Sequence, residues 1–253
     1  MSSGGVDAAP LDGRRRRWQE HNQARRQVII DAAIAVLERQ APGEEFQVQA
    51  VADQAGMSRT VIYRHFEDRA DLDRAVQRQI CEDVGNELLP ALSYDGTPDQ
   101  IIHRIVGSFV RWAEAHPSLY WFAERDLAGW GPSPLGQAVE QVAESIEGIM
   151  AVVVAALGVE LSDDDRAALD PWVFGMIGAV FASVRRWLER DVREPGIDTC
   201  INILSESIWL QINGMALARG LNLPDLPVSE LLQALQPGGE ERAEERAEER
   251  AEE

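Results

Sequence analysis

The stretch FQVQAVADQAGMSRTVIYRHF, residues 46–66, decides the fold that we expect for this chain. Its first part has apolar residues at the spacing i, i+3, i+4 and i+7, which form one stripe on a short helix. These residues are Val48, Val51, Ala52 and Ala55. Gly56 follows, and glycine readily adopts the left-handed conformation that reverses a chain. The pattern therefore predicts a short helix that ends in a tight turn.

The second part of the stretch predicts a helix with two different faces. Ser58 can cap its start, because a serine oxygen accepts a hydrogen bond from the free amides of a first turn. The back of the helix is apolar, with Val61, Ile62 and Phe66. The front carries hydrogen-bond donors, namely Arg59, Thr60, Tyr63, Arg64 and His65. Such a helix pair fits a DNA major groove, and the alternative is a helical hairpin inside a bundle.

The remainder of the chain also has the pattern of helices. Apolar residues recur at helical spacing, and no stretch of the sequence shows the alternation that is typical of a β-strand. Prolines and glycines separate the segments, as at Ala41-Pro42-Gly43 and Pro195-Gly196. We therefore predict an all-α fold of roughly nine or ten helices, with an N-terminal three-helix helix-turn-helix domain and a C-terminal helical domain.

The net charge of −19 repels nucleic acid, but the charges are not spread evenly. Residues 14–69 carry ten Arg against eight Asp and Glu, whereas residues 70–239 carry eleven Arg against twenty-five acids. The N-terminal part is therefore where we expect any surface that binds phosphates.

Both ends of the chain have a biased composition. Residues 1–13 are rich in Gly, Ser and Pro and lead into the run Arg14, Arg15, Arg16, Arg17, so we predict a disordered basic arm over residues 1–23. This arm either enters an A·T-rich minor groove or is simply solvated. Residues 240–253 repeat Ala-Glu-Glu-Arg, which would place like charges at i,i+4 on a helix. We predict an acidic, disordered tail over residues 237–253.

Residues 24–75 resemble the DNA-binding domain of the TetR family of bacterial repressors. The matching residues are Val51-Ala52, Ala55-Gly56-Met57-Ser58, Ile62-Tyr63-Arg64-His65-Phe66, Arg69 and Leu72. A turn centred on glycine is common, but Gly-x-Ser followed by Tyr-x-His-Phe at this spacing is specific. The resemblance implies a helix-turn-helix domain over residues 24–70 and a domain for ligand binding and dimerisation over residues 71–236.

The resemblance also implies roles in DNA binding. Gln49 is placed to reach a base from the first helix of the motif, and glutamine can bond adenine through two atoms. Arg59 and Thr60 lie at the start of the second helix, where Arg59 suits a guanine. Tyr63, His65 and Arg69 match positions that bind phosphates, which fix register without reading sequence. The predicted set is Gln49, Ser58, Arg59, Thr60, Tyr63, His65, Arg69 and the run Arg14–Arg17.

Two positions depart from the family's pattern. Val61 stands where many relatives have Thr, so one phosphate contact is expected to be missing. Gln47 stands where Thr usually caps the first helix of the motif. Neither change alters the expected fold.

Two long apolar segments, residues 165–190 and 199–219, predict a dimer interface. Each is apolar on two faces, and such a helix must be buried on both sides. Two of these helices per subunit make a four-helix interface across a two-fold axis, as in TetR relatives, and their burial inside a monomer is the alternative. The predicted interface residues are Trp172, Met176, Val180, Trp187, Leu204, Ile208, Ile212 and Met215. A two-fold protein implies a palindromic operator with half-sites roughly 34–36 Å apart.

Aromatic residues are frequent in the middle of the chain, where the family encloses a small-molecule inducer that releases DNA. They would suit a flat or apolar ligand, although ordinary core packing is the alternative for any single one. The predicted pocket residues are Phe109, Trp112, Trp121, Phe122, Arg125, Trp130 and Phe174.

The sequence contains no motif of a common enzyme class, such as GxSxG, a P-loop or GxGxxG. Cys81 and Cys200 are the only cysteines and lie in no metal-binding pattern, so we expect no metal and no cofactor.

The longest uncharged run of the strongly apolar region, Pro171–Val184, is too short to span a bilayer. We therefore expect a cytoplasmic, nucleoid-associated homodimer that represses transcription and is not an enzyme. The alternative is an architectural or adaptor protein that binds DNA without a ligand.

Overall fold

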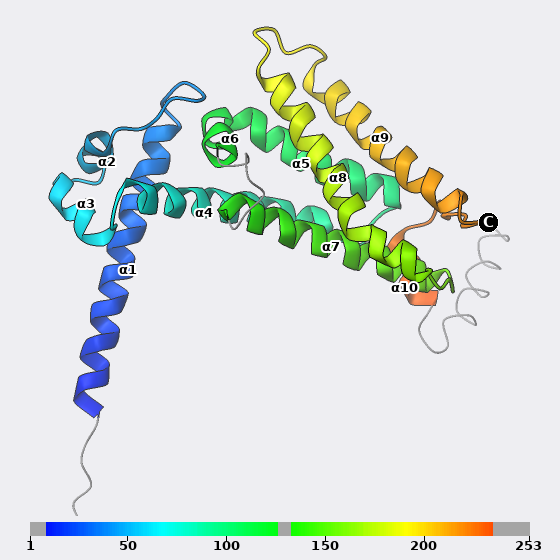
Figure 1. Ribbon diagram of the computed structural model, residues 1–253, viewed down its shortest axis with the longest axis horizontal. Helices are drawn as coiled ribbons and strands as arrows, with labels where there is room; N and C mark the ends of the chain where they lie inside the picture. Colours follow the sequence, from blue (N-terminus) through cyan, green and yellow to red (C-terminus); the bar gives the residue numbers. More distant parts are fainter. Residues whose placement is uncertain (1–8, 126–132, 235–253) are drawn as a thin grey trace, which may run out of the picture. The chain divides into compact units, whose positions relative to one another are not determined.

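A computed structural model describes the backbone of residues 9–125 and 133–234, and the side chains of residues 20–125 and 133–233. Ten α-helices and one short 3-10 helix, η1, make up these ranges, which contain no β-strand, and this confirms the predicted all-α fold (Figure 1). The helices are α1 (Ala9–Leu37), α2 (Val48–Gln54), α3 (Arg59–His65), α4 (Arg69–Leu88), η1 (Leu89–Leu92), α5 (Pro98–Ala115), α6 (Pro117–Glu124), α7 (Pro134–Ala156), α8 (Asp163–Leu188), α9 (Ile197–Leu217) and α10 (Val228–Ala234).

The chain forms two compact units. Unit 1 contains Met1–Cys81 and His116–Leu135, and unit 2 contains Glu82–Ala115 and Gly136–Glu253. The sequence placed every residue from 71 to 236 in one domain, whereas α6 belongs to unit 1. The reason is hydrogen bonding within that unit. Ser118 Oγ of α6 donates to the Gln40 carbonyl at 2.7 Å, and Gln77 Nε2 of α4 donates to the Phe122 carbonyl at 3.2 Å.

Helix α1 is longer than the sequence suggested. It begins at Ala9, so residues 9–23 are helical and are not the disordered arm that we predicted, while residues 1–8 lie outside the described part. The physical reason is composition, because residues 14–26 contain neither Gly nor Pro and six of the thirteen are Arg, which favours helix. The helix ends at Leu37, and Gly43 in the following turn has a φ of 85°.

Helices α2 and α3 form the predicted helix-turn-helix. Gly56 has a φ of 65°, the left-handed conformation expected for the turn, and the amide of Met57 donates to the Ala52 carbonyl at 2.9 Å. Ser58 precedes α3 with extended backbone angles, as a capping residue does, but its side chain makes no capping hydrogen bond. The position of the cap was predicted correctly, whereas its side-chain bond was not.

The core of unit 1 includes Val48, Val51 and Ala52 of the predicted stripe, which are buried, whereas Ala55 is half-buried. Helices α1 to α4 and the segments between them contribute side chains that are almost fully buried. The largest are Phe46, Phe66, Ile29, Leu37, Ile62 and Leu72. Each such side chain contributes about 1.5–3 kcal/mol to folding. Ile62 lies on the back of α3, so its burial holds this helix against the unit and leaves the opposite face outward.

Unit 2 is built around a close packing of α5 against α9. Polar pairs lie along this contact. His103 Nε2 and Asn202 Oδ1 are 2.9 Å apart, and Arg111 Nη2 is 3.3 Å from Asp198 Oδ1. A Cβ at Gly107 would lie 3.6 Å from Ile201, an ordinary van der Waals contact, and 2.8 Å from the flexible end of Arg111 on the same helix, so the packing does not depend on glycine there.

Helix α8 begins after Ser162, which caps it by accepting a hydrogen bond from the amide of Asp165 at 3.1 Å. It is the one described helix that is long and apolar enough to cross a membrane by length and composition. Val173 and Met176 are buried in a cluster with Ile208 and Ile212 of α9, but only 17% of the apolar stretch of α8 is buried within the subunit.

Candidate DNA-recognition surface

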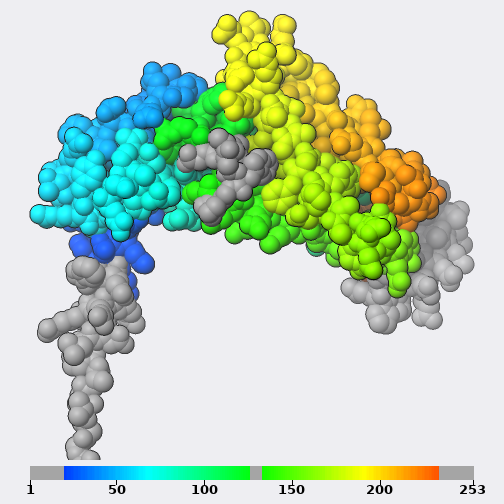
Figure 2. Space-filling model, viewed as in Figure 1, coloured from blue at the N-terminus to red at the C-terminus, as the bar shows by residue number. Residues whose placement is uncertain are grey.

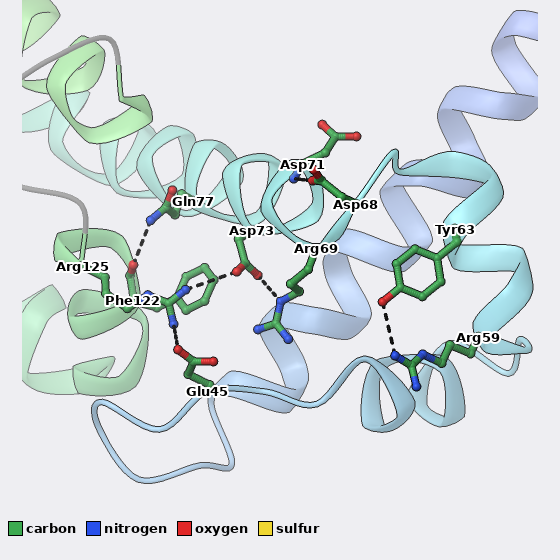
Figure 3. A network of polar contacts seen from close by, with 10 residues as sticks. All are labelled: Glu45, Arg59, Tyr63, Asp68, Arg69, Asp71, Asp73, Gln77, Phe122 and Arg125. Carbon is green, nitrogen blue, oxygen red and sulfur yellow. Dashed lines mark hydrogen bonds and ion pairs between the residues drawn. The ribbon is translucent and has the colours of Figure 1, made fainter.

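Helix α3 presents donors outward, as its sequence pattern predicts. Ile62 is fully buried behind it, whereas Tyr63 is 40% exposed and Arg59, Thr60 and Arg64 are exposed. Arg59 lies beside Tyr63, with Nη2 3.5 Å from the phenol oxygen and the guanidinium 5.6 Å from the ring centre (Figure 3). In Figure 2 the cyan atoms of α3 lie at the surface. The face is therefore polar, positively charged and open to a partner.

Gln49 lies on the exposed side of α2, which the sequence predicted to reach a base. Its amide nitrogen donates to Asp53 Oδ1, one turn further along the helix, at 2.8 Å. This bond holds the amide group in one orientation, and a base contact would have to compete with it.

The C-terminal end of α3 is held by Arg26 of α1, a residue that no sequence motif indicated. Arg26 Nη1 donates to the His65 carbonyl, and its guanidinium lies 4.1 Å from the centre of the Phe66 ring. Nη1 is also 3.8 Å from Asp71 Oδ2 at the start of α4. A cation suits this place, because the last carbonyls of a helix have no partner within it and carry partial negative charge.

His65, a predicted phosphate contact, is half-buried among positive charges. Burial lowers the pKa of His65 below its usual value, and the charges of Arg25, Arg26 and His21 on α1 lower it further. At neutral pH the imidazole is therefore neutral in the free protein. It can still donate one N–H to a phosphate, and the cations around it attract the same anion.

Arg69, the remaining predicted phosphate contact, is turned toward its own unit. Its Nε donates to Asp73 Oδ1 at 2.7 Å, and its guanidinium lies 4.0 Å from the centre of the Phe46 ring. In Figure 3 the same Asp73 carboxylate also pairs with Arg125, at the end of α6. The i,i+4 spacing of Arg69 and Asp73 on a helix is compatible with their ion pair. No sequence pattern indicates the pair of Arg125 with Asp73.

The predicted pocket residues fall into both units. Trp121, Phe122 and Arg125 belong to unit 1, Phe109, Trp112 and Phe174 belong to unit 2, and Trp130 lies outside the described residues. Within unit 2, Phe109 packs on Phe181 with ring centres 4.7 Å apart, and Trp112 is buried. Within unit 1, Arg125 pairs with two carboxylates, Asp73 and Glu45. These contacts give Arg125 a partner other than a ligand.

The predicted dimer residues do not share one free face. Met176, Val180 and Trp187 are buried inside the subunit, so the prediction is corrected for these three. Trp172, Leu204, Ile208 and Ile212 are half-buried, and Met215 is 38% exposed. A periodic pattern shows that a helix has two apolar faces but not which one its own fold covers. The free face of α9 carries instead Ile203, Leu210 and Leu217.

The described residues contain no group of three or more His, Cys, Asp or Glu side chains that could hold a metal ion. The described arginines of α1, α3 and α4 offer charge and hydrogen-bond donors, which suit binding to a phosphate backbone.

Comparison with known proteins agrees with this geometry. Residues 29–76 match the profile of "Bacterial regulatory proteins, tetR family". The HTH-type transcriptional regulator Rv0472c of Mycobacterium tuberculosis is 27% identical over 210 residues, which cover 83% of this chain and 86% of the relative.

Two solved structures have the same fold. A tetR-family transcriptional regulator from Streptomyces coelicolor aligns over 88% of this chain and 98% of its own, with a TM-score of 0.56 and 18% identity. The regulator FadR of Bacillus subtilis, solved with stearoyl-CoA, aligns over 74% of this chain and 98% of its own, with a TM-score of 0.56 and 17% identity.

The helix pair α2–α3 with its Gly56 turn, together with these matches, defines a helix-turn-helix transcriptional regulator. Residues 29–76 therefore form a DNA-binding domain of the TetR type, and over most of its length the chain is similar to HTH-type transcriptional regulators.

Proposed function

We propose that this regulator binds a palindromic operator as a homodimer, represses transcription from it, and is released by a small apolar or aromatic ligand. The observation that carries the proposal is the orientation of α3, whose apolar side is buried while Arg59, Thr60 and Tyr63 face outward. An arginine on such a face can bond a guanine through two atoms, and the other donors suit phosphate oxygens.

Charge supports the assignment of DNA binding to unit 1. Residues 14–69 carry an excess of arginine in a chain whose net charge is −19, so the acidic remainder directs a nucleic acid toward this part. The run Arg14–Arg17 precedes the described side chains of α1 and would neutralise further phosphates. Replacing all four with Ala is expected to flatten the salt dependence of binding by about 0.9 in log–log slope for each phosphate that is no longer neutralised.

The free face of α9 supports the homodimer. Ile203, Leu210 and Leu217 are spaced i, i+7 and i+14, so they lie on one side of the helix, and each is more than half exposed. The neighbouring helix α8 exposes small residues, including Gly175, Ala179 and Ala182. Large apolar side chains beside small ones allow two copies to approach closely, and a pair of helices from each copy would form a four-helix interface.

The apolar interior of unit 2 supports a ligand of matching character. Phe109, Trp112 and Phe174 lie in this unit, and FadR was solved with stearoyl-CoA, which carries a long apolar chain. Aromatic and aliphatic walls favour apolar ligands, and a few polar groups then orient them. We propose that such a ligand binds unit 2 and weakens operator binding by favouring a different conformation of the dimer.

The test is a fluorescence anisotropy titration of the full chain with a labelled duplex from the non-coding DNA that flanks its gene. A scrambled duplex of equal length is the control. We expect specific binding, with an affinity at least roughly a thousandfold above that for the scrambled duplex at physiological salt. A screen of fatty acyl-CoA and small aromatic compounds should then yield one that releases the DNA. Equal affinity for the two duplexes would contradict the proposal, and specific binding that no ligand releases would favour a ligand-independent adaptor.

We place this activity in the cytoplasm, at the nucleoid, because operator DNA is the proposed partner.

A further inference from the structure

We propose that Arg125, at the end of α6, is a positioning residue for DNA binding, which acts by holding Asp73 and, through it, Arg69. This inference rests on the proposed function, in which Arg69 contacts a phosphate. It adds a residue that lies 52 positions beyond Asp73 and outside the residues 29–76 that match the family profile.

The geometric basis is a closed ring of five side chains within unit 1. Arg69 lies 4.0 Å from the centre of the Phe46 ring, Phe46 lies 5.5 Å from Phe122 between ring centres, and Arg125 lies 4.8 Å from the centre of the Phe122 ring. Asp73 closes the ring, because it pairs with Arg69 at 2.7 Å and with Arg125 at 3.2 Å. Two neighbouring aromatic rings are thus flanked by two cations, and one carboxylate joins the cations (Figure 3 shows the polar members).

The two oxygens of Asp73 are used by different partners. Oδ1 accepts from Arg69 Nε, and Oδ2 accepts from Arg125 Nη2. A carboxylate that is bonded at both oxygens cannot rotate without breaking a charged hydrogen bond, which is among the stronger hydrogen bonds in proteins. Arg125 therefore fixes the orientation of the oxygen that holds Arg69. The Asp73 side chain is only 17% exposed, so solvent screens these pairs less than it screens a surface pair.

Arg125 is itself held on a second side. Its Nη1 lies 3.2 Å from Glu45 Oε1 in the segment between α1 and α2, so its guanidinium spans two carboxylates from two segments. The planar fork of arginine can bond both at once, whereas the single ammonium of lysine has no fixed fork. Glu45 is 65% exposed, so this second pair is the weaker one.

The consequence for DNA binding follows from the place of Arg69. It is the first residue of α4 and follows the last residue of α3 by four positions. Phe46 below its guanidinium and Asp73 at its Nε limit the conformations of a long, flexible side chain that is 30% exposed. Without Arg125, Asp73 gains freedom, Arg69 loses its fixed partner, and ordering Arg69 on DNA costs more conformational entropy.

The experiment is a double-mutant cycle on operator binding by the full-length chain. The variants are Arg125→Gln, Arg69→Gln and the double variant, and the probe is the labelled flanking duplex at several salt concentrations. Arg78→Gln is the matched control, since it removes the same charge from an exposed position on α4. Melting followed by circular dichroism reports the folded state of each variant.

We expect Arg125→Gln to weaken binding about five- to tenfold and to reduce the log–log salt slope by about 0.9, the value for one phosphate contact. In the Arg69→Gln background the same change should have little further effect, because both act through one contact. Arg78→Gln should lower the affinity less and additively with Arg69→Gln. A change of slope distinguishes positioning from a loss of stability, which lowers the active fraction without changing the slope.

The inference is overturned if Arg125→Gln leaves the slope unchanged or if its effect adds fully to that of Arg69→Gln. If Arg125→Gln does not fold, Arg125→Lys replaces it, and a weakening of about threefold that vanishes in the Arg69→Gln background is the expected result. Failure of the proposed function looks different. In that case the wild-type chain does not distinguish the flanking duplex from the scrambled one, and both proposals fall.

Discussion

Helices α3 and α9 expose opposite kinds of surface. Helix α3 buries Ile62 and presents Arg59 and Tyr63, whereas α9 buries Ile201 and presents Ile203 and Leu210. Both helices are two-faced, and each buries one apolar stripe in its own unit. The difference lies in what remains outside, which is donors in one case and large apolar side chains in the other.

This difference indicates the partner of each surface. A donor-rich face loses little by staying in water and gains from an anion, so it fits a nucleic acid. A row of exposed isoleucine and leucine is unfavourable in water and is covered most simply by a second copy of the same row. The two surfaces can be tested separately, from the largest expected effect to the smallest.

The largest effect is expected from a charge on the free face of α9. Leu210→Glu should convert a dimer into a monomer, because the interface would bury a charge without a partner, at a cost of several kcal/mol. Leu210 is 61% exposed in the subunit, so the subunit fold should not change. Light scattering measures the mass, and operator affinity should fall by on the order of a hundredfold.

The matched control is Val192→Glu, which adds the same charge at a position that is 68% exposed and lies between α8 and α9. It should remain dimeric. A dimer in both variants would mean that another face joins the subunits.

The next effect concerns base reading by α3. Arg59→Ala should lower operator affinity by about 1–3 kcal/mol and leave the affinity for a scrambled duplex almost unchanged, since one base contact is worth roughly that much discrimination. Anisotropy with both duplexes measures this. An equal loss on both duplexes would assign Arg59 to a phosphate.

A smaller effect is expected from Arg26, which holds the end of α3 through the His65 carbonyl and the Phe66 ring. Arg26→Gln should weaken operator binding by about 1 kcal/mol, because a charged hydrogen bond to the helix end is removed. Arg25→Gln is the control, since it removes the same charge from the adjacent, exposed position. If Arg26→Gln and Arg25→Gln weaken operator binding equally, the loss of positive charge alone accounts for the effect. The contact of Arg26 with the end of α3 would then make no separate contribution.

The smallest effect is the pH dependence of stability from His65. The pKa of His65 is lowered in the folded protein from the value of 6.5 that applies to the unfolded chain. At a pH between the folded and the unfolded pKa, the unfolded chain therefore holds more protons on this residue than the folded chain does. The free energy of unfolding should therefore rise with pH through that window and be unaffected by His65 above it. Urea unfolding at pH 5 and pH 7.5 should show a smaller difference for His65→Gln than for wild type. His103→Gln in unit 2 is the control, and an identical change in both variants would contradict the prediction.

The sequence predicted those parts of the fold that depend on local pattern. The turn at Gly56 and the start of α3 after Ser58 follow from residue type and helical spacing, and the structure has both. The extension of α1 to Ala9 was missed because a run of arginines was interpreted by its charge instead of by its helix propensity.

Contacts between distant segments could not be predicted in this way. Arg26 meets the end of α3 across 39 positions, and Arg125 meets Asp73 across 52. Nothing in the local pattern of either residue indicates its partner. The same limit explains the dimer residues, because periodicity identified two apolar faces on α8 but not that Met176 and Val180 lie on the covered one.

The most direct measurement is site-specific photocrosslinking to DNA. The variant Thr60→p-benzoylphenylalanine places the probe on the exposed face of α3, and Val192→p-benzoylphenylalanine places it on an exposed segment outside both surfaces. With the flanking duplex, illumination should crosslink the first variant to DNA and not the second. DNA binding by both variants with no crosslink from position 60 would show that α3 is not the helix that contacts DNA.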